Sequence, residues 1–197
     1  MLAERPGSFR LEVLSPFGTV ALAASDGREF AVYARRESRV YRGPAGPGSV
    51  GAYAAVPLEV ADVVTVLLGA PPGRAATGAA TVGRDDDAGL IHLAVPIETG
   101  IQEVWFAPET LHPVRSATPL PDGRILYVSF GDWKQVGALA FPYRIDLRAE
   151  PGNDAVHVRY GSPSLNTDIA DHLFGFPPRS GVEELRIEQY PVSGTAS

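Results

Sequence analysis

The strongest constraint in this chain is a series of short runs in which apolar residues occupy every second position. Phe9, Leu11 and Val13 alternate with polar residues in the first of these runs. Successive side chains of a β-strand point to opposite faces of a sheet, so a period of two indicates strands with one buried face. The runs are separated by turns too short for a parallel crossover, and neighbouring strands are therefore expected to pair as antiparallel hairpins.

Such runs recur along nearly the whole sequence. We expect about eleven short strands, at the spacing of roughly 8–12 residues that is typical of β-sandwiches and barrels. They cover residues 9–13, 20–22, 30–32, 39–41, 77–82, 90–95, 102–106, 114–118, 124–130, 143–148 and 155–160. The Asp26-Gly27 pair between two runs is a hairpin signal. The pattern predicts a mainly β protein of the α+β class, forming a single domain over residues 1–197.

One stretch, residues 57–72, is the best candidate for a helix. Pro57 suits a first helical turn, and Gly69 followed by two prolines is a stop signal. Glu59, Asp62 and Thr65 recur at steps of three and form one narrow polar stripe, so the rest of the helix must be covered. The many valines leave a buried strand as the alternative.

Residues 46–51, GPGSVG, match the G-x-G-x-x-G pattern of dinucleotide-binding folds. That motif functions in a parallel βαβ unit, whereas the surrounding strands are joined by hairpin turns. Pro47 also lacks the backbone N–H that a phosphate would require at this position. We interpret the stretch as a loop between a strand and the helix.

Charge and composition exclude several classes of partner. The net charge is −6 and Lys134 is the single lysine, which argues against nucleic acid and anionic membranes because both are bound by clustered cations. The chain has no cysteine, which excludes disulfides and thiolate metal sites. No run approaches the roughly 20 apolar residues of a transmembrane helix.

Both ends of the sequence are expected to lie outside the folded domain. The first residues lack the apolar core of a signal peptide, and a strand begins almost at once. We therefore expect a removed leader or tether upstream, with residues 1–7 as a residual linker and residues 190–197 as a flexible tail.

The sequence offers no recognisable catalytic arrangement. Its four histidines lie at no metal-ligand spacing, and there is no G-x-S-x-G elbow. Asp168, Asp171 and His172 are interpreted as turn and solvent residues. The run Asp85–Asp87 is interpreted as a solvated hairpin tip, with a calcium ligand loop as the alternative. We predict no enzyme, no cofactor and no metal.

An incompletely closed antiparallel sheet with an apolar helix across it can leave an apolar cavity, the usual place for a ligand in such folds. The alternative is that the same residues form a filled core. The predicted lining consists of the alternating apolar strand residues and one helix face: Leu11, Val13, Val20, Leu22, Phe30, Val32, Val60, Val64, Leu67, Leu68, Val104, Phe106, Leu126, Val128, Phe130, Ile145 and Leu147.

The order of several motifs resembles the LolA/LolB superfamily, and more closely the uncharacterised bacterial envelope lipoproteins related to it. The motifs are the LSPFG turn after the first strand, the LLG helix end, an FP turn into an I-x-L strand, and the LN…F pair before the closing segment. Together they cover nearly the whole chain.

The resemblance implies an unclosed antiparallel β-barrel of about eleven strands with helices across its concave face. It further implies a protein of the periplasm or outer membrane, anchored through an upstream lipidated segment. Such a protein would bind a lipid or the acyl chain of a lipoprotein in trafficking to the outer membrane, and would contact other envelope proteins. The alternative function is a non-transporting scaffold subunit of an envelope assembly, with the same fold and a filled core.

Overall fold

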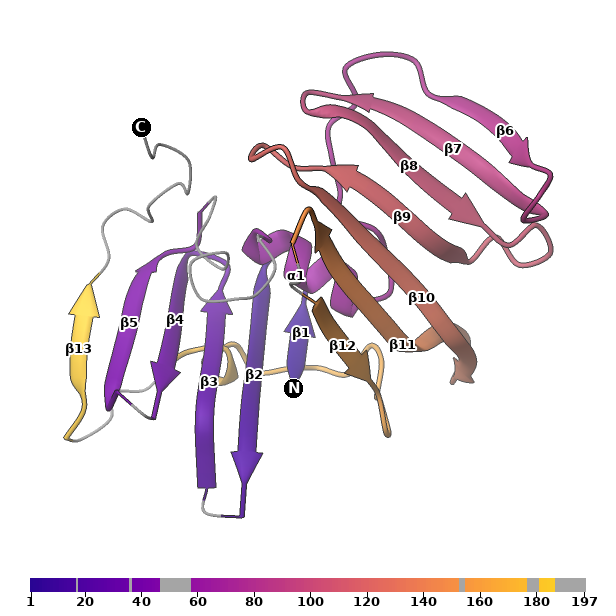
Figure 1. Ribbon diagram of the computed structural model, residues 1–197. Helices are drawn as coiled ribbons and strands as arrows, with labels where there is room; N and C mark the ends of the chain where they lie inside the picture. Colours follow the sequence, from indigo (N-terminus) through magenta and orange to yellow (C-terminus); the bar gives the residue numbers. More distant parts are fainter. Residues whose placement is uncertain (17, 36, 47–57, 153–154, 177–180, 187–197) are drawn as a thin grey trace, which may run out of the picture. The chain divides into compact units, whose positions relative to one another are not determined.

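The computed structural model describes residues 1–197 except 17, 36, 47–57, 153–154, 177–180 and 187–197 (Figure 1). The chain divides into two compact units: Met1–Val64 with Thr167–Ser193, and Thr65–Asn166 with Gly194–Ser197. Each unit contains one β-sheet, so the protein is mainly β, as the alternating pattern predicts. The expected tail, residues 190–197, and most of the G-x-G-x-x-G stretch lie outside the described residues.

The first unit contains a six-stranded mixed sheet, in the order β1-β2-β3-β4-β5-β13. Its strands are β1 (Leu2–Glu4), β2 (Ser8–Ser15), β3 (Gly18–Asp26), β4 (Glu29–Ala34), β5 (Arg39–Pro44) and β13 (Glu183–Arg186). A 3₁₀ turn, η1 (Asp171–Leu173), precedes β13. Residues 1–7, interpreted as a linker, include β1 at the edge of this sheet.

The hairpin between β3 and β4 turns at Asp26 and Gly27, as expected. Gly27 has a φ of 84°, a conformation that glycine adopts without a Cβ clash. The Asp26 carboxylate accepts hydrogen bonds from the backbone N–H groups of Arg28 and Glu29, both at 2.8 Å. Burial acts to raise the pKa of Asp26, but these hydrogen bonds outweigh it and lower the pKa.

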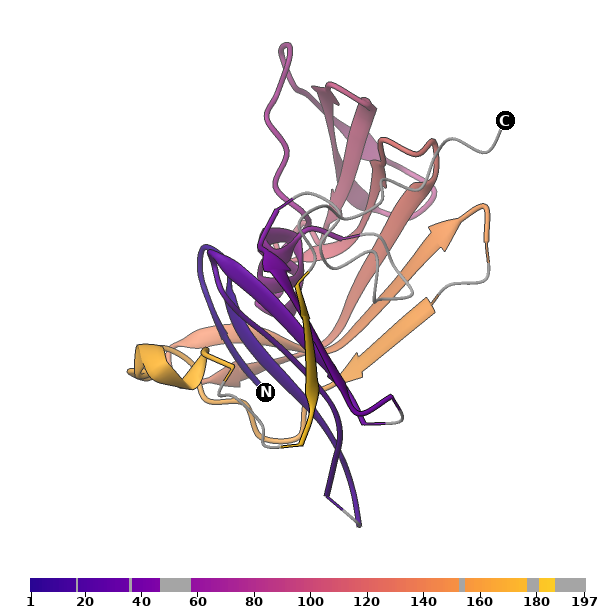
Figure 2. The same ribbon diagram turned by 90° about the vertical axis from the view of Figure 1, so that its left-hand side faces the viewer.

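The last strand of this sheet, β13, pairs in parallel with β5 (Figure 2). Ion pairs join the two strands, with Arg39 contacting Glu183 at 2.9 Å and Arg42 contacting Glu184 at 2.5 Å. Burial lowers the pKa of the Arg42 guanidinium, but its hydrogen bonds to carboxylates raise it overall, so the group stays charged. The expected pairing is mostly antiparallel, and this pair is the parallel exception among the described strands.

The predicted helix is present as α1 (Val60–Leu67), which excludes the alternative of a buried strand. Asp62 is buried, and its carboxylate accepts a hydrogen bond from the backbone N–H of Glu59, which caps the first turn. At the other end, the Gly69 N–H donates to the Val66 carbonyl and the Ala70 N–H donates to the Thr65 carbonyl. This pair of bonds is a Schellman motif, and it explains the predicted stop.

The second unit contains a seven-stranded antiparallel meander, in the order β12-β11-β10-β9-β8-β7-β6 (Figure 1). Its strands are β6 (Thr81–Asp85), β7 (Leu90–Ile97), β8 (Gly100–Phe106), β9 (Pro113–Pro119), β10 (Ile125–Val136), β11 (Leu139–Glu150) and β12 (Ala155–Arg159). Every strand pairs with its neighbours in sequence, which confirms the hairpin connections expected here. No helix within the described ranges is long and apolar enough to cross a membrane.

The described residues form two separate sheets, and neither closes into a barrel. The prediction of about eleven strands does not include β1 and β13. These two strands have three and four residues and show no clear alternation. The strand expected at residues 77–82 begins instead at Thr81. Before it, Ala76 forms only an isolated bridge with Ile97.

Gly69 offers a test of how closely the helix end packs within the second unit. A Cβ at Gly69 would lie 2.7 Å from Cδ of Pro142, whereas a Cβ at Gly123 would meet nothing within 4 Å. Both glycines have positive φ, 85° and 82°, so Gly→Ala costs each about 1–2 kcal/mol of backbone strain. Overpacking adds about 1–3 kcal/mol at Gly69 alone. We expect Gly69→Ala to lower the free energy of unfolding, measured in urea, by about 1–3 kcal/mol more than Gly123→Ala does. Equal losses for the two variants would contradict the close contact between Gly69 and Pro142.

Candidate functional site

The apolar residues predicted from the first unit do not share one face. In the register of β2, β3 and β4, Leu11 pairs with Ala23, which pairs with Val32, so Leu11 and Val32 lie on the same face. Leu22 pairs with Glu12 and Tyr33 and lies on the opposite face, in a cluster with Phe176. The side chain of Val20 lies outside the described part of the strand. The structure therefore separates Leu22 from the other predicted residues, because strand register, which alternation does not reveal, decides the face.

The remaining predicted residues, Phe30 and Val13 among them, differ in how far they are buried. Phe30 is buried beside Phe9, with ring centroids 6.1 Å apart, whereas Val13 near the hairpin end is 58 % exposed. In the helix, Val60, Val64 and Leu67 are buried and Leu68 is half-buried.

The predicted residues of the second unit do share one face. Pairing of Val104 with Ser116, Ser116 with Val128 and Val128 with Leu147 places them in one row. Leu126, Phe130, Ile145 and Phe106 belong to the same face by their pairing. Leu126, Val128 and Ile145 are 0 % exposed, so neighbouring groups cover each of these side chains. These three side chains form a filled core in this structure, and the predicted cavity stays a prediction.

The same apolar face continues beyond this core to strands β6 and β7. Val82 pairs with Leu93 and Leu93 with Val104, while Ile91 pairs with Phe106. Here the face is open: Val82 is 72 % exposed, and its neighbours are half-buried. We call this open part the apolar strip; it consists of Val82, Ile91, Leu93, Val95 and Phe106. Of these residues only Phe106 is among the predicted lining, although Ile91, Leu93 and Val95 alternate visibly in the sequence.

Three buried polar residues, Gln102, Ser116 and Thr118, interrupt the apolar face. The amide Nε2 of Gln102 donates to the Pro72 carbonyl at 2.8 Å and to the Thr118 hydroxyl at 2.9 Å. These bonds attach the segment after the helix to the sheet. The hydroxyl of Ser116, which is 1 % exposed, has no hydrogen-bond partner among the described residues. A buried hydroxyl without a partner loses its hydration and gains nothing in return.

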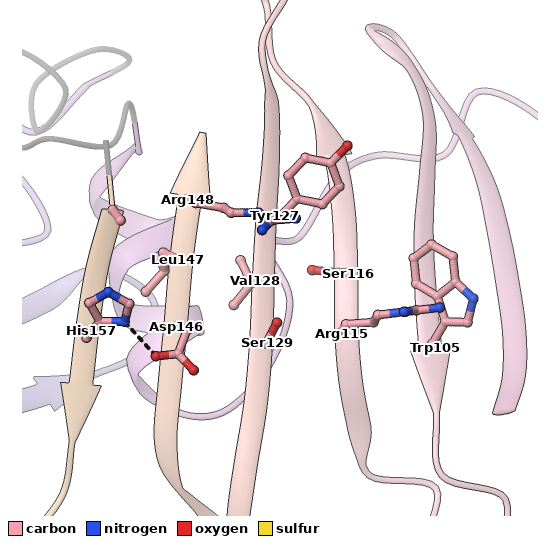
Figure 3. Close-up of a pocket in the computed structure, with 11 residues that line it drawn as sticks. Trp105, Arg115, Ser116, Tyr127, Val128, Ser129, Asp146, Leu147, Arg148 and His157 are labelled. Atoms are coloured by element: carbon pink, nitrogen blue, oxygen red, sulfur yellow. Dashed lines mark hydrogen bonds and ion pairs between the residues drawn. The ribbon is translucent and has the colours of Figure 1, made fainter. Parts of the chain in front are cut away.

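The opposite face of the same sheet carries a hollow of about 440 Å³, shown in Figure 3. We call it the polar hollow. Side chains on this face line it, and Ser116, Val128 and Leu147 of the other face complete the lining. The lining residues on this face are Trp105, Arg115, Tyr127, Ser129, Asp146, Arg148, Ala155 and His157. None of them is among the predicted site residues, because they occupy the polar phase of the alternation.

Two arginines on this face stack on aromatic rings. The Arg115 guanidinium lies 4.5 Å from the ring centroid of Trp105, and the Arg148 guanidinium lies 4.8 Å from that of Tyr127 (Figure 3). Such cation–π contacts are worth about 0.5–1 kcal/mol at exposed sites. Nδ1 of His157 lies 2.7 Å from Oδ1 of Asp146, so a hydrogen bond holds this histidine.

A second hollow, of about 620 Å³, lies in the first unit and is lined by Leu2, Arg10, His172, Leu173, Gly175 and Phe176. Arg10 is already engaged there, donating to Glu12 at 2.9 Å and to the Gly175 carbonyl at 3.1 Å. The Arg10 guanidinium is therefore largely occupied by bonds within the protein and offers few donors to a ligand in this hollow.

The acidic turn between β6 and β7 is held by a local hydrogen bond and by two ion pairs, one of them to β9. The Asp85 carboxylate accepts a hydrogen bond from the Ala88 N–H at 3.0 Å and pairs with Arg115 at 3.1 Å, and Asp86 pairs with Arg84 at 3.4 Å. Within the described ranges, no group of three or more histidine or acidic side chains is arranged to hold a metal ion.

Comparison with known proteins found no match: no family model, no curated protein and no solved structure matches this chain. The resemblance to LolA/LolB-like proteins is therefore carried by the order of short motifs alone. The functions considered below depend on the two faces of the second sheet.

Ser116 and Thr118 provide a matched test of the buried face, because both are hydroxyl residues of β9 and both are fully buried. Ser116→Ala removes an unpartnered hydroxyl, so we expect the free energy of unfolding to stay equal or to rise by about 1 kcal/mol. Thr118→Val removes an acceptor of Gln102 and is expected to cost about 1–3 kcal/mol. Urea unfolding of both variants measures the contrast. A large loss for Ser116→Ala would show that its hydroxyl is bonded.

Proposed function

We propose that this protein is a lipid-binding protein of the bacterial cell envelope, not an enzyme, and that it holds an acyl chain of a lipid or lipoprotein on the apolar strip. The observation that carries the proposal is the opening of the apolar face at β6 and β7, where Val82 is 72 % exposed and its apolar neighbours are half-buried. A contiguous apolar surface left open to water is a common mark of a binding site.

The resemblance to LolA/LolB-like proteins supports the kind of ligand and the location. The best-known members of the LolA/LolB superfamily carry lipoproteins through the periplasm by covering their acyl chains. The proposal includes the unclosed barrel that this resemblance implies, and a role in the periplasm or at the outer membrane, in lipoprotein trafficking or in contact with other envelope proteins.

The affinity of the strip for an acyl chain can be estimated from the hydrophobic contribution of each methylene group. A fully buried CH₂ contributes about 0.8 kcal/mol, so about ten methylenes on the strip give at most roughly 8 kcal/mol, and association costs make the dissociation constant micromolar or weaker. Each methylene added to the ligand is then expected to tighten binding by up to roughly fourfold until the strip is covered. Fatty acids of increasing length, competing with a dansylated fatty acid, measure this slope.

Val82 and Thr81 give the decisive pair of variants. They are adjacent exposed residues of β6 whose side chains point to opposite faces, so Val82→Glu charges the apolar strip and Thr81→Glu charges the other face. We expect Val82→Glu to weaken binding of the dansylated fatty acid at least tenfold and Thr81→Glu to leave it unchanged. Equal effects of the two variants would place the lipid elsewhere. Val128→Asp is unsuitable, because Val128 is 0 % exposed and its replacement would test folding.

The second candidate is a scaffold subunit of an envelope assembly. The observation that favours it is the complete burial of Leu126, Val128 and Ile145, which shows that the centre of the apolar face is filled. No saturable fatty-acid binding by the folded protein, for any chain length, would favour the scaffold over the lipid carrier.

A further inference from the structure

The polar hollow lies where two rows of side chains cross the second sheet. Register places Trp105, Arg115, Ser129, Asp146 and His157 side by side in one row. The next row consists of Glu103, Ala117, Tyr127, Arg148 and Ala155. In both rows small residues stand beside large ones, so the sheet is hollowed over Ser129 and bordered by planar side chains (Figure 3).

The first row contains a column of stacked planar groups. The His92 ring stacks on Trp105 with centroids 4.8 Å apart, and the Arg115 guanidinium follows at 4.5 Å from the Trp105 ring. These spacings match the distance between neighbouring strands, which is about 4.8 Å. The Arg115 side chain extends from β9 over Trp105 to the Asp85 carboxylate of β6, away from Ser129 (Figure 3). The short Ser129 side chain therefore leaves room for a flat molecule between Arg115 on β9 and Asp146 on β11.

The charges around the hollow favour an anion. Arg115 and Arg148 are 48 % and 61 % exposed, and their carboxylate partners, Asp85 and Glu150, lie outside the lining. Exposed ion pairs of this kind contribute at most about 1 kcal/mol, so a ligand can displace them. The lining carries two guanidinium groups against one carboxylate, that of Asp146, which pairs with Arg144 at 3.4 Å and contacts His157 at 2.7 Å. The planar donors of the guanidinium groups suit carboxylate and phosphate groups.

We propose that the polar hollow binds a small planar aromatic anion, with its ring seated over Ser129 and its carboxylate or phosphate held by Arg148 and by Arg115 in place of Asp85. A volume of about 440 Å³ suits a small-molecule ligand. This site lies on the face opposite the apolar strip and is independent of acyl-chain binding.

Three probes separate the two parts of the proposal. 2-Naphthoate is planar and anionic, 2-naphthalenemethanol is planar and neutral, and cyclohexanecarboxylate is anionic without an aromatic ring. The readout is the indole N–H signal of Trp105 in a proton–nitrogen NMR spectrum. The chain has two tryptophans, so Trp133→Phe assigns the pair of signals. We expect 2-naphthoate to shift the Trp105 signal saturably and the other two probes to bind at least tenfold more weakly.

Two variants test the position of the ligand. Ser129→Leu fills the hollow from an exposed position, and Arg148→Met removes one cation, so each is expected to weaken 2-naphthoate binding at least tenfold. Gln135→Leu, at another exposed position of β10, is the control and should leave binding unchanged. Val82→Glu should also preserve the Trp105 shift, which separates this site from the apolar strip.

The proposal would be overturned by any of three results with the folded protein: no saturable Trp105 shift, equal binding of the neutral probe, or full binding to Ser129→Leu. Loss of fatty-acid binding alone would leave these readouts unaffected.

Discussion

The hydrogen-bond register of the seven-stranded meander determines nearly everything else in the second unit. Because side chains alternate across a sheet, a slip of one residue in β8 would move Trp105 to the apolar face and Val104 to the polar one. With the observed register, aliphatic side chains form one face and arginine–aromatic pairs form the other. The two candidate binding surfaces are thus the two sides of a single ladder, and neither exists without it.

The two faces differ in how firmly they are held. The centre of the apolar face consists of side chains without exposed surface, and close packing of this kind tolerates little change in volume. The polar hollow is bordered by long side chains such as Arg115 and Arg148, whose stacking and ion-pair contacts are individually weak. A rigid support with an adaptable surface is suited to binding, because the side chains can rearrange while the backbone stays in place.

The sequence pattern predicts the secondary-structure elements better than it predicts which residues lie side by side in a sheet. Alternation located the strands of the meander, and Asp26-Gly27 and Gly69 marked turns that the structure confirms. The short strands β1 and β13 exist only through their partners, so local sequence holds little sign of them. The polar hollow depends on Ser129 lying beside Arg115 across two strands, and residues this far apart in sequence are brought together only by register. The same reason explains why alternation alone does not separate Leu22 from Leu11 and Val32, which lie on the opposite face.

The parallel pairing of β5 with β13 has a consequence for the newly made chain. Strand β5 ends at Pro44, and β13 begins only at Glu183, so a ribosome completes the whole second sheet before the partner of β5 appears. Until then the edge of β5 is unpaired, and the cluster around Leu22, Tyr33 and Val40 lacks Phe176. Unpaired strand edges and uncovered apolar surface promote aggregation. The amino-terminal strands β1–β5 therefore depend, during their own synthesis, on residues that are translated near the end.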